Sequence, residues 1–308
     1  MHDPVLCDEV VAALVTGPGG RYIDATLGDG GHALALLKAA GDDGAVLGLD
    51  RDAVAIEAAT KRLSDFGERF QTAQTNFGAL SEVAERTGFN AVDGVLFDLG
   101  VRSNQLDEAE RGFSFMREGP LDMRMDQGQA DTAARWVNEA NEADLAQVFW
   151  KLGEERASRR IAKAIVARRA ERPFEQTLDL AELISEATGG RRGRIHPATR
   201  AFMALRMVVN QELEEIEAGL AGAIQCLKPG GRLAVITYHS IEDRLVKRIL
   251  ARHIGRWESL QAGGRVWIGD MPRMERVTRK PLIPTTEELE QNARARSAKL
   301  RIVERSES

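Results

Sequence analysis

Short apolar runs alternate with longer helix-like stretches through the first hundred residues. The apolar runs are short and partly β-branched, as buried strands are, and they cover 21–27, 44–50, 70–77 and 91–100. The stretches between them predict helices at 32–40, 53–63 and 79–87. Such alternation is typical of a mostly parallel sheet with helices on both faces, a Rossmann-like α/β fold.

The pattern changes at about residue 107, and no run between 107 and 210 predicts a strand. Four amphipathic stretches in this region predict helices instead, at 132–139, 141–153, 154–172 and 178–187. The sequence therefore predicts an all-helical insertion over 107–210.

After the insertion, the pattern returns to that of the first hundred residues. Pro197 suits the first turn of a long helix, or of a pair of helices, that continues to Cys226. Strand-like runs follow at 232–240 and 298–305. We therefore expect residues 1–106 and 211–308 to form one α/β domain, interrupted by the helical insertion.

A glycine turn lies between the first predicted strand and the first predicted helix. Gly28, Gly30 and Gly31 allow the backbone to bend sharply and approach a ligand closely, and Asp50 ends the second strand. A carboxylate about twenty residues beyond such glycines can accept both hydroxyls of a ribose, so the pattern predicts an adenosine-containing cofactor. A plain tight turn at the glycines and a helix N-cap at Asp50 are the simpler alternatives.

Three features favour S-adenosylmethionine over a dinucleotide as that cofactor. The turn lacks the third glycine of the dinucleotide pattern, and Asp98 ends the fourth strand, where methyltransferases of this fold place a residue facing the methyl donor. In addition, the helix–Leu-Lys-Pro-Gly-Gly–strand passage at 227–236 resembles the entry to the fifth strand in methyltransferases.

Charge is distributed unevenly along the chain of 308 residues, whose net charge is −5. Residues 1–100 hold 16 acidic and seven basic side chains, so the remainder is net basic. Basic residues cluster at 156–169, 191–194 and 273–280. The basic part suits a polyanionic partner such as RNA, although solvated helix faces would give the same pattern.

The two cysteines, Cys7 and Cys226, are far apart and lie in no paired motif. We therefore expect no disulfide framework and no bound metal, and the composition fits a reducing cytoplasm. No segment has the roughly 18 apolar residues that a membrane span needs, so we expect no membrane partner.

Four motifs of the chain form a recognisable set: Asp98–Val101, Gln105–Asp126, His196–Arg200 and His239–Arg244. The run over 105–126 is long and highly specific. Together these motifs resemble the RsmH (MraW) family of methyltransferases. The resemblance extends nearly from end to end of the chain. It implies a class I S-adenosylmethionine-dependent enzyme that methylates the N4 amine of a cytidine in the decoding region of bacterial small-subunit ribosomal RNA.

The resemblance also implies a set of cofactor contacts. The matching positions here are Gly30, Gly31, His32, Asp50, Phe77, Asp98 and Gln105. In this interpretation the glycines approach the methionine part of the cofactor, Asp50 binds the ribose and Phe77 packs on the adenine. Asp98 and Gln105 then bind near the amino-acid end or the sulfonium.

Asp98 and His239 are the expected catalytic residues. A carboxylate that accepts an N–H of the cytosine amine would help to aim its lone pair at the methyl group. Candidates to stack on the target base are Phe113, Phe115, Tyr238 and His239. Anchoring of the two phenylalanines in a core, and a backbone hydrogen bond for His239, are equally consistent with the sequence.

The arginines of the helical insertion are candidates for phosphate contacts, namely Arg159, Arg160, Arg168 and Arg169. We expect the RNA to be bound within an assembled or nearly assembled small subunit, and a homodimer is possible. Two other functions stay open on the residues alone: an NAD-dependent oxidoreductase and a non-catalytic RNA-binding assembly factor.

Overall fold

The computed structural model describes residues 4–101, 107–190, 196–261 and 263–307. The chain divides into two compact units, one comprising Met1–Gly100 with Leu213–Ser308 and the other Val101–Glu212. The sequence predicted these boundaries at 106 and 211. Each unit is described separately below.

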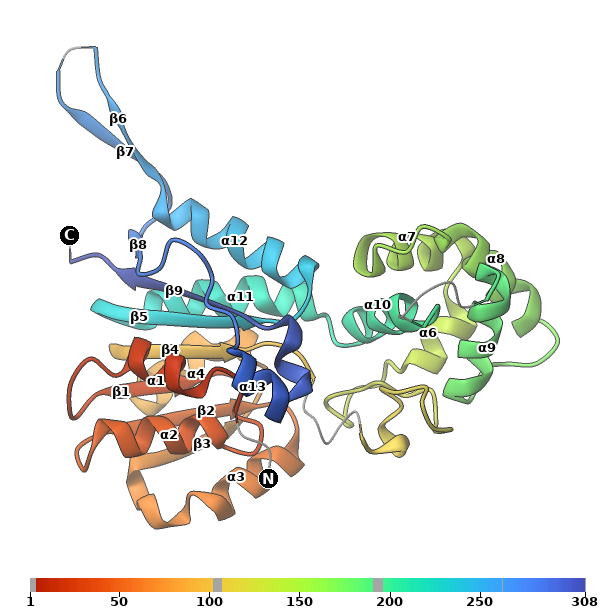
Figure 1. The fold of residues 1–308 in the computed structure, drawn as a ribbon, viewed down its shortest axis with the longest axis horizontal. Helices are drawn as coiled ribbons and strands as arrows, with labels where there is room; N and C mark the ends of the chain where they lie inside the picture. Colours follow the sequence, from red (N-terminus) through yellow and green to blue (C-terminus); the bar gives the residue numbers. More distant parts are fainter. Residues whose placement is uncertain (1–3, 102–106, 191–195, 262, 308) are drawn as a thin grey trace. The chain divides into compact units, whose positions relative to one another are not determined.

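The first unit is built on a seven-stranded sheet in the order β3-β2-β1-β4-β5-β9-β8 (Figure 1). Its strands are β1 (Arg21–Asp24), β2 (Ala45–Asp50), β3 (Phe70–Gln74), β4 (Val92–Asp98), β5 (Leu227–Thr237), β8 (Met274–Arg276) and β9 (Lys299–Arg305). The first five run parallel to one another, whereas β9 is antiparallel to β5 and β8 to β9. The predicted Rossmann-like, mostly parallel sheet is confirmed.

Helices cover both faces of this sheet. They are α1 (Cys7–Leu14), α2 (Gly31–Ala40), α3 (Ala53–Arg62), α4 (Leu80–Thr87), α11 (Glu212–Cys226), α12 (Ser240–Ile254) and α13 (Thr286–Gln291). Side chains alternate along the strands between two cores: in β4, Leu96 packs with α1 and α2, whereas Val95 and Phe97 pack with α4, α11 and α12. This alternation explains why the parallel strands are apolar on both sides.

Strands β1 and β4 are neighbours in the sheet, although β2 and β3 lie between them in sequence. The chain therefore leaves β1 in one direction across the sheet and leaves β4 in the other. In parallel α/β sheets, ligands bind beyond the carboxyl ends of the strands at such a switch point. Asp24 and Asp98 end these two strands.

The second unit is helical. Its helices are α6 (Ala133–Glu139), α7 (Glu142–Gly153), α8 (Ser158–Arg169), α9 (Thr177–Thr188) and α10 (Thr199–Val209). Helix α7 packs on α8 and α10, α8 packs on α9, and buried aromatic residues such as Phe149 and Phe174 fill their shared core. The described part of this unit contains one isolated β-bridge, between Pro120 and Gln176, and no strand.

Several elements differ from the prediction or were missing from it. Of the two alternatives expected before β5, a long helix or a pair of helices, the structure has the pair, α10 and α11, separated at Asn210 and Gln211, where Gln211 has a φ of 51°. The prediction missed α1, α12, α13 and β8, and also a separate hairpin formed by β6 (Arg256–Ser259) and β7 (Arg265–Ile268). Among the described helices, none combines the length and hydrophobicity that a membrane span requires.

Candidate active site

The turn between β1 and α2 requires glycine at two positions. Gly30 caps α2 with a φ of 74°, and a Cβ there would lie only 3.1 Å from Cδ1 of Leu63 and 3.2 Å from Cβ of Ala59. A Cβ on Gly31 would lie 2.6 Å from Cγ of Pro4. The turn therefore keeps its backbone close to its surroundings only because these residues lack side chains.

Asp50 holds the glycine turn against the end of β2. Its Oδ2 accepts a hydrogen bond from the Gly28 amide at 2.9 Å, and its Oδ1 accepts one from the Asp52 amide at 2.9 Å. The N-cap of α3 is Asp52, whose carboxylate accepts from the Val54 amide. The alternative of a helix cap at Asp50 is therefore wrong, while ribose binding by Asp50 stays a prediction.

Asp98, at the carboxyl end of β4, is contacted by two side chains. The Tyr238 hydroxyl donates a hydrogen bond to its Oδ1 at 2.7 Å. Nε2 of His32 lies 3.6 Å from its Oδ2, an ion-pair distance rather than a hydrogen bond. The Asp98 side chain stays 23% exposed, so it can still meet a ligand.

Three groups around Asp98 have displaced pKa values. Burial works against a charged His32, but its interactions with the Asp98 carboxylate, the Cys7 thiol and the Asp24 carboxylate outweigh it and raise the pKa of His32 to about 10. Burial raises the pKa of Asp24 to about 6. Burial, followed by the Asp98 charge, raises the pKa of Tyr238, which keeps its hydroxyl protonated as a donor.

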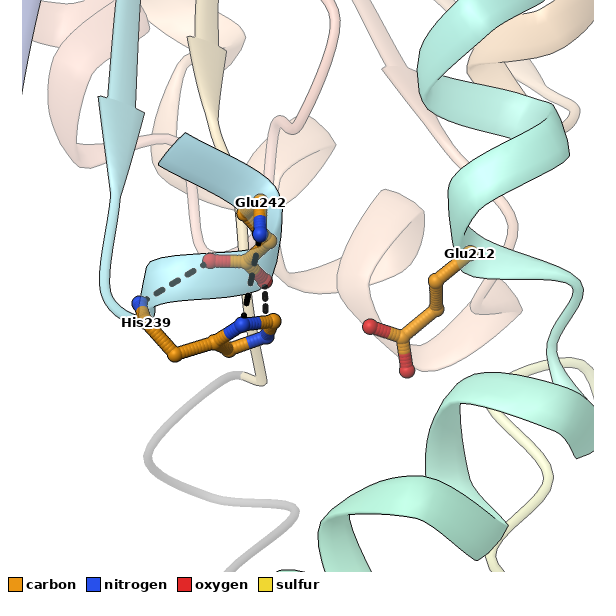
Figure 2. Close-up of side chains that lie close together, drawn as sticks. All are labelled: Glu212, His239 and Glu242. Atoms are coloured by element: carbon orange, nitrogen blue, oxygen red, sulfur yellow. Dashed lines mark hydrogen bonds and ion pairs between the residues drawn. The ribbon is translucent and has the colours of Figure 1, made fainter. Parts of the chain in front are cut away.

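His239 has a structural role in this arrangement, shown in Figure 2. Its Nδ1 accepts from the Glu242 amide, and Glu242 accepts from the His239 amide, which together form a capping box at the start of α12. Its Nε2 lies 2.8 Å from Oε1 of Glu242. His239 therefore makes the backbone hydrogen bond that the simpler alternative expected. These contacts give no support to a catalytic role for His239.

Glu212, also drawn in Figure 2, belongs to the helical unit. Its carboxylate accepts two hydrogen bonds from the Arg206 guanidinium, at 2.7 and 2.6 Å. Both side chains are largely buried, so this bidentate pair secures the end of α10 within its own unit.

Phe77 begins a short turn after β3 and is half-buried. Its ring packs edge-on against Phe97, with centroids 5.5 Å apart, and the Arg51 guanidinium lies 5.8 Å from its centroid. A Cβ on Gly219 of α11 would lie 2.8 Å from the Phe77 ring. The ring is therefore held in place, and its contact with an adenine stays a prediction.

The four arginines expected to bind phosphates fall into two pairs. Arg159 and Arg160 are exposed at the start of α8, and no described residue pairs with either. Arg168 contacts Asp179 and packs over the Phe174 ring at 4.0 Å, while Arg169 donates to the Val137 and Ala140 carbonyls. The second pair therefore holds the helical unit together.

The two phenylalanines proposed to stack on the base lie in the core of the helical unit. Phe113 is buried, and Phe115 packs against His196 and Phe202 with centroids 4.7 and 4.8 Å away. These contacts agree with the alternative in which the two phenylalanines are anchored in a core.

Two predicted sites lie outside the described residues, which omit 102–106 and 191–195. They are the cofactor contact Gln105 and the basic cluster at 191–194.

The sequence analysis missed two members of the site. Tyr238 was considered only as a stacking residue, whereas its hydroxyl holds Asp98. Asp24 is fully buried, and its Oδ2 has no hydrogen-bond partner among the described residues. The signal for Asp24 was available, because it ends a strand just before the glycine turn as Asp50 and Asp98 end theirs.

These observations fit an adenosine cofactor with a charged amino-acid part. The glycine turn leaves no room for side chains, and the unpartnered Asp24 oxygen and the Asp98 carboxylate offer acceptors for an ammonium group. Gly30, Gly31, Asp50 and Asp98 would hold such a cofactor at the carboxyl edge of the sheet.

Comparison with known proteins supports this interpretation. A family model described as the MraW methylase family matches residues 1–306. A protein of Carboxydothermus hydrogenoformans named "Ribosomal RNA small subunit methyltransferase H" is 49% identical over 305 residues, which cover 99% of this chain and 97% of that protein. One of Syntrophobacter fumaroxidans with the same name is 47% identical over 306 residues, covering 99% and 96%.

These matches confirm the resemblance predicted from the sequence, and with it S-adenosylmethionine as the cofactor of this class of methyltransferase. The family model covers nearly the whole chain, and the relatives are almost half identical to it over their whole length. The chain belongs to the MraW methylase family.

Proposed function

We propose that this protein transfers a methyl group from S-adenosylmethionine to the N4 amine of a specific cytidine in the decoding region of bacterial small-subunit ribosomal RNA. The names of its relatives support the RNA substrate, and the resemblance of its motifs supports the N4 position. The observation that carries the proposal is the Asp98 carboxylate, partly exposed at the end of β4 and oriented by Tyr238.

The chemistry needs an acceptor at this place. The exocyclic amine of cytosine is a poor nucleophile because its lone pair is delocalised into the ring. When bound, S-adenosylmethionine supplies an electrophilic methyl group. A carboxylate that accepts one N–H of the amine localises the lone pair and aligns it, and alignment with charge complementarity provides most of the catalysis.

Tyr238 and His32 act through Asp98. The tyrosine hydroxyl occupies one carboxylate oxygen, and a protonated His32 lies beside the other. Because the pKa of His32 is raised to about 10, the imidazole is positively charged at neutral pH and attracts the Asp98 carboxylate beside it. The two side chains thereby fix the direction in which the carboxylate accepts a hydrogen bond.

The substrate side of the proposal rests on the exposed arginines. Arg159 and Arg160 are both exposed on α8 and would contact phosphates of the RNA. Recognition within an assembled subunit, a cytoplasmic location and a homodimeric state all stay predictions. An NAD-dependent oxidoreductase has lost its support, because the methylase family model covers residues 1–306.

The test is methyl transfer from labelled S-adenosylmethionine to small ribosomal subunits taken from cells that lack this protein. The RNA is then digested and the methylated nucleoside identified. We expect N4-methylcytidine at a single site, with Tyr238→Phe slower by roughly tenfold, as for loss of one hydrogen bond to a charged group.

Naked small-subunit RNA in a parallel reaction separates the two forms of the substrate. A different methylated nucleoside would overturn the proposed position, and no incorporation into either substrate despite cofactor binding would overturn the proposed activity.

A further inference from the structure

The β6–β7 hairpin is separate from the seven-stranded sheet. Its four residue pairs run from Arg256 opposite Ile268 to Ser259 opposite Arg265, and it projects beyond the end of α12 (Figure 1). A lone two-stranded hairpin is marginally stable in water, so a hairpin that persists needs a stabilising feature.

That feature is a tryptophan pair. Trp267 lies over two glycines, since a Cβ on Gly255 would be 2.5 Å from its ring and one on Gly269 would be 3.0 Å from its Nε1. Trp257 is its cross-strand partner, with ring centroids 5.6 Å apart. The Arg273 guanidinium lies 5.8 and 5.6 Å from the two ring centroids.

Trp257 is consequently fixed in position yet 52% exposed. Half of the surface of this large aromatic ring stays in water although the ring is packed on Trp267. It offers a flat face whose orientation is already set, so a planar ligand that stacks on it loses little conformational entropy.

The charges near the hairpin are mainly positive. The three carboxylates of residues 252–280 each pair with an arginine of the same segment: Asp270 with Arg252, Glu258 with Arg256, and Glu275 with Arg273. Four cations of the segment are exposed and have no ion-pair partner among the described residues, namely Arg265, Arg276, Arg279 and Lys280. This excess of positive charge stands out in a chain whose net charge is −5.

We propose that the β6–β7 hairpin is a second RNA-binding surface, on which a single-stranded segment of ribosomal RNA stacks a base on Trp257 and places phosphates against Arg265 and the cations that follow it. The inference rests on the proposed function, which supplies the RNA. An exposed aromatic ring on a hairpin that also carries an exposed, unpaired arginine is suited to bind single-stranded nucleic acid with little sequence preference.

The hairpin lies far from Asp98. Helix α12 begins just beyond the carboxyl end of β5 and runs for 15 residues, about 22 Å, before the hairpin starts. The surface can therefore anchor RNA without touching the reacting groups. Its loss should raise the KM for RNA and leave kcat at saturating RNA unchanged.

The experiment measures binding of the full-length protein to purified small-subunit ribosomal RNA by filter retention at several salt concentrations. We expect Trp257→Ala to weaken binding by about 5- to 100-fold and Trp257→Phe to restore most of it. Arg265→Gln should weaken binding. It should also reduce the slope of the logarithm of the binding constant against the logarithm of the salt concentration by about one. Arg86→Gln, which removes an exposed cation from α4, is the matched control and should change neither.

Cofactor binding and circular dichroism confirm that each variant is folded. Trp257→Ala and Arg265→Gln variants that bind RNA as tightly as the wild type would overturn the inference. If the same variants instead changed only the sedimentation of the protein, the hairpin would be a contact between copies of the chain.

This test is separate from that of the proposed function. A wild-type protein that binds the RNA through the hairpin but transfers no methyl group would overturn the proposed activity alone. If the wild type methylates RNA and the Trp257→Ala variant does so with the same KM, the inference about the hairpin alone would be overturned.

Discussion

The carboxyl edge of the sheet and the helical unit both depend on charged side chains, but they use them in opposite ways. At the sheet edge, Asp24 and His32 are buried and have displaced pKa values. In the helical unit, Arg168 and Arg169 satisfy carbonyls and a carboxylate inside their own unit. A basic cluster in a sequence can therefore be structural, whereas an ionisable group buried beside others at a strand end indicates chemistry.

The strongest test of the sheet edge is Asp98→Ala. We expect kcat for methyl transfer to fall by about 100-fold or more, because a preorganised hydrogen-bond partner of the reacting amine is lost. Single-turnover kinetics with bound cofactor measure this loss directly.

Glu57→Gln provides the control for Asp98→Ala, since Glu57 is an exposed carboxylate on α3. It should leave the rate unchanged. An Asp98→Ala rate within a few-fold of the wild type would mean that Asp98 is not the acceptor, and would favour a non-catalytic role for the protein.

The two arginine pairs of α8 should separate stability from binding. Arg168→Gln removes an ion pair with Asp179 and a contact with the Phe174 ring, so the free energy of unfolding should fall by roughly 1–3 kcal/mol. Arg159→Gln should change it by less than about 0.5 kcal/mol. Urea denaturation measures both changes.

RNA binding should show the reverse order. Arg159→Gln is expected to weaken binding several-fold. Because one phosphate contact is lost, the slope of the logarithm of the binding constant against the logarithm of the salt concentration should fall by about 0.7 to 0.9. Equal effects of the two substitutions on RNA binding would contradict the division of α8 into an accessible and a structural pair.

The glycine turn can be tested against a glycine of the same backbone conformation. Gly30 and Gly88 have nearly equal dihedral angles, with φ of 74° and 75° and ψ of 25° and 20°. Alanine at either costs about 1 kcal/mol for the left-handed backbone. Only at Gly30 does the new Cβ also meet Leu63 and Ala59 within 3.2 Å.

We therefore expect Gly30→Ala to be less stable than Gly88→Ala by roughly another 1 kcal/mol. Calorimetric titration should show weaker binding of S-adenosylmethionine for Gly30→Ala alone. Equal cofactor affinities in the two variants would mean that the turn does not contact the cofactor.

His32 should also make the stability of the protein depend on pH. Its pKa is about 10 in the folded protein, above its ordinary value of 6.5, so the folded state keeps a proton that the unfolded state releases. The free energy of unfolding should fall, relative to that of His32→Gln, by up to about 1.4 kcal/mol per pH unit as pH rises from 7 toward 10.

Urea denaturation at pH 7, 8 and 9 measures this difference. Asp24 contributes little there, because its pKa of about 6 places its own titration below pH 7. Parallel pH profiles for the wild type and the variant would show that His32 is not charged in the folded protein.

The sheet strands and the glycine turn were predictable because local patterns determine them. The apolar runs that end at Asp50 and Asp98 are strands β2 and β4, and the turn before α2 has the left-handed glycine that the sequence indicated. Helix α12 was missed because its buried positions alternate with many charged residues and its N-cap is a histidine, an unusual capping residue.

The site was predictable only where a residue's role depends on its own strand. That Tyr238 holds Asp98 depends on β4 and β5 being neighbours, although 140 positions separate the two residues. That Arg168 is structural depends on Asp179 and Phe174, which reach it only once the helices pack. Such roles follow from tertiary contacts, which periodicity and spacing do not encode.

The placement of the helical unit between β4 and β5 has a kinetic consequence. Asp98 lies opposite Ile236 in the sheet, so this pairing must close a loop that contains the entire helical unit. Long loops slow folding, whereas helical units rich in local contacts fold quickly. We expect the helices to form first and shorten the disordered loop, so that a slowly folding insertion would delay the joining of β5 to the strands before it.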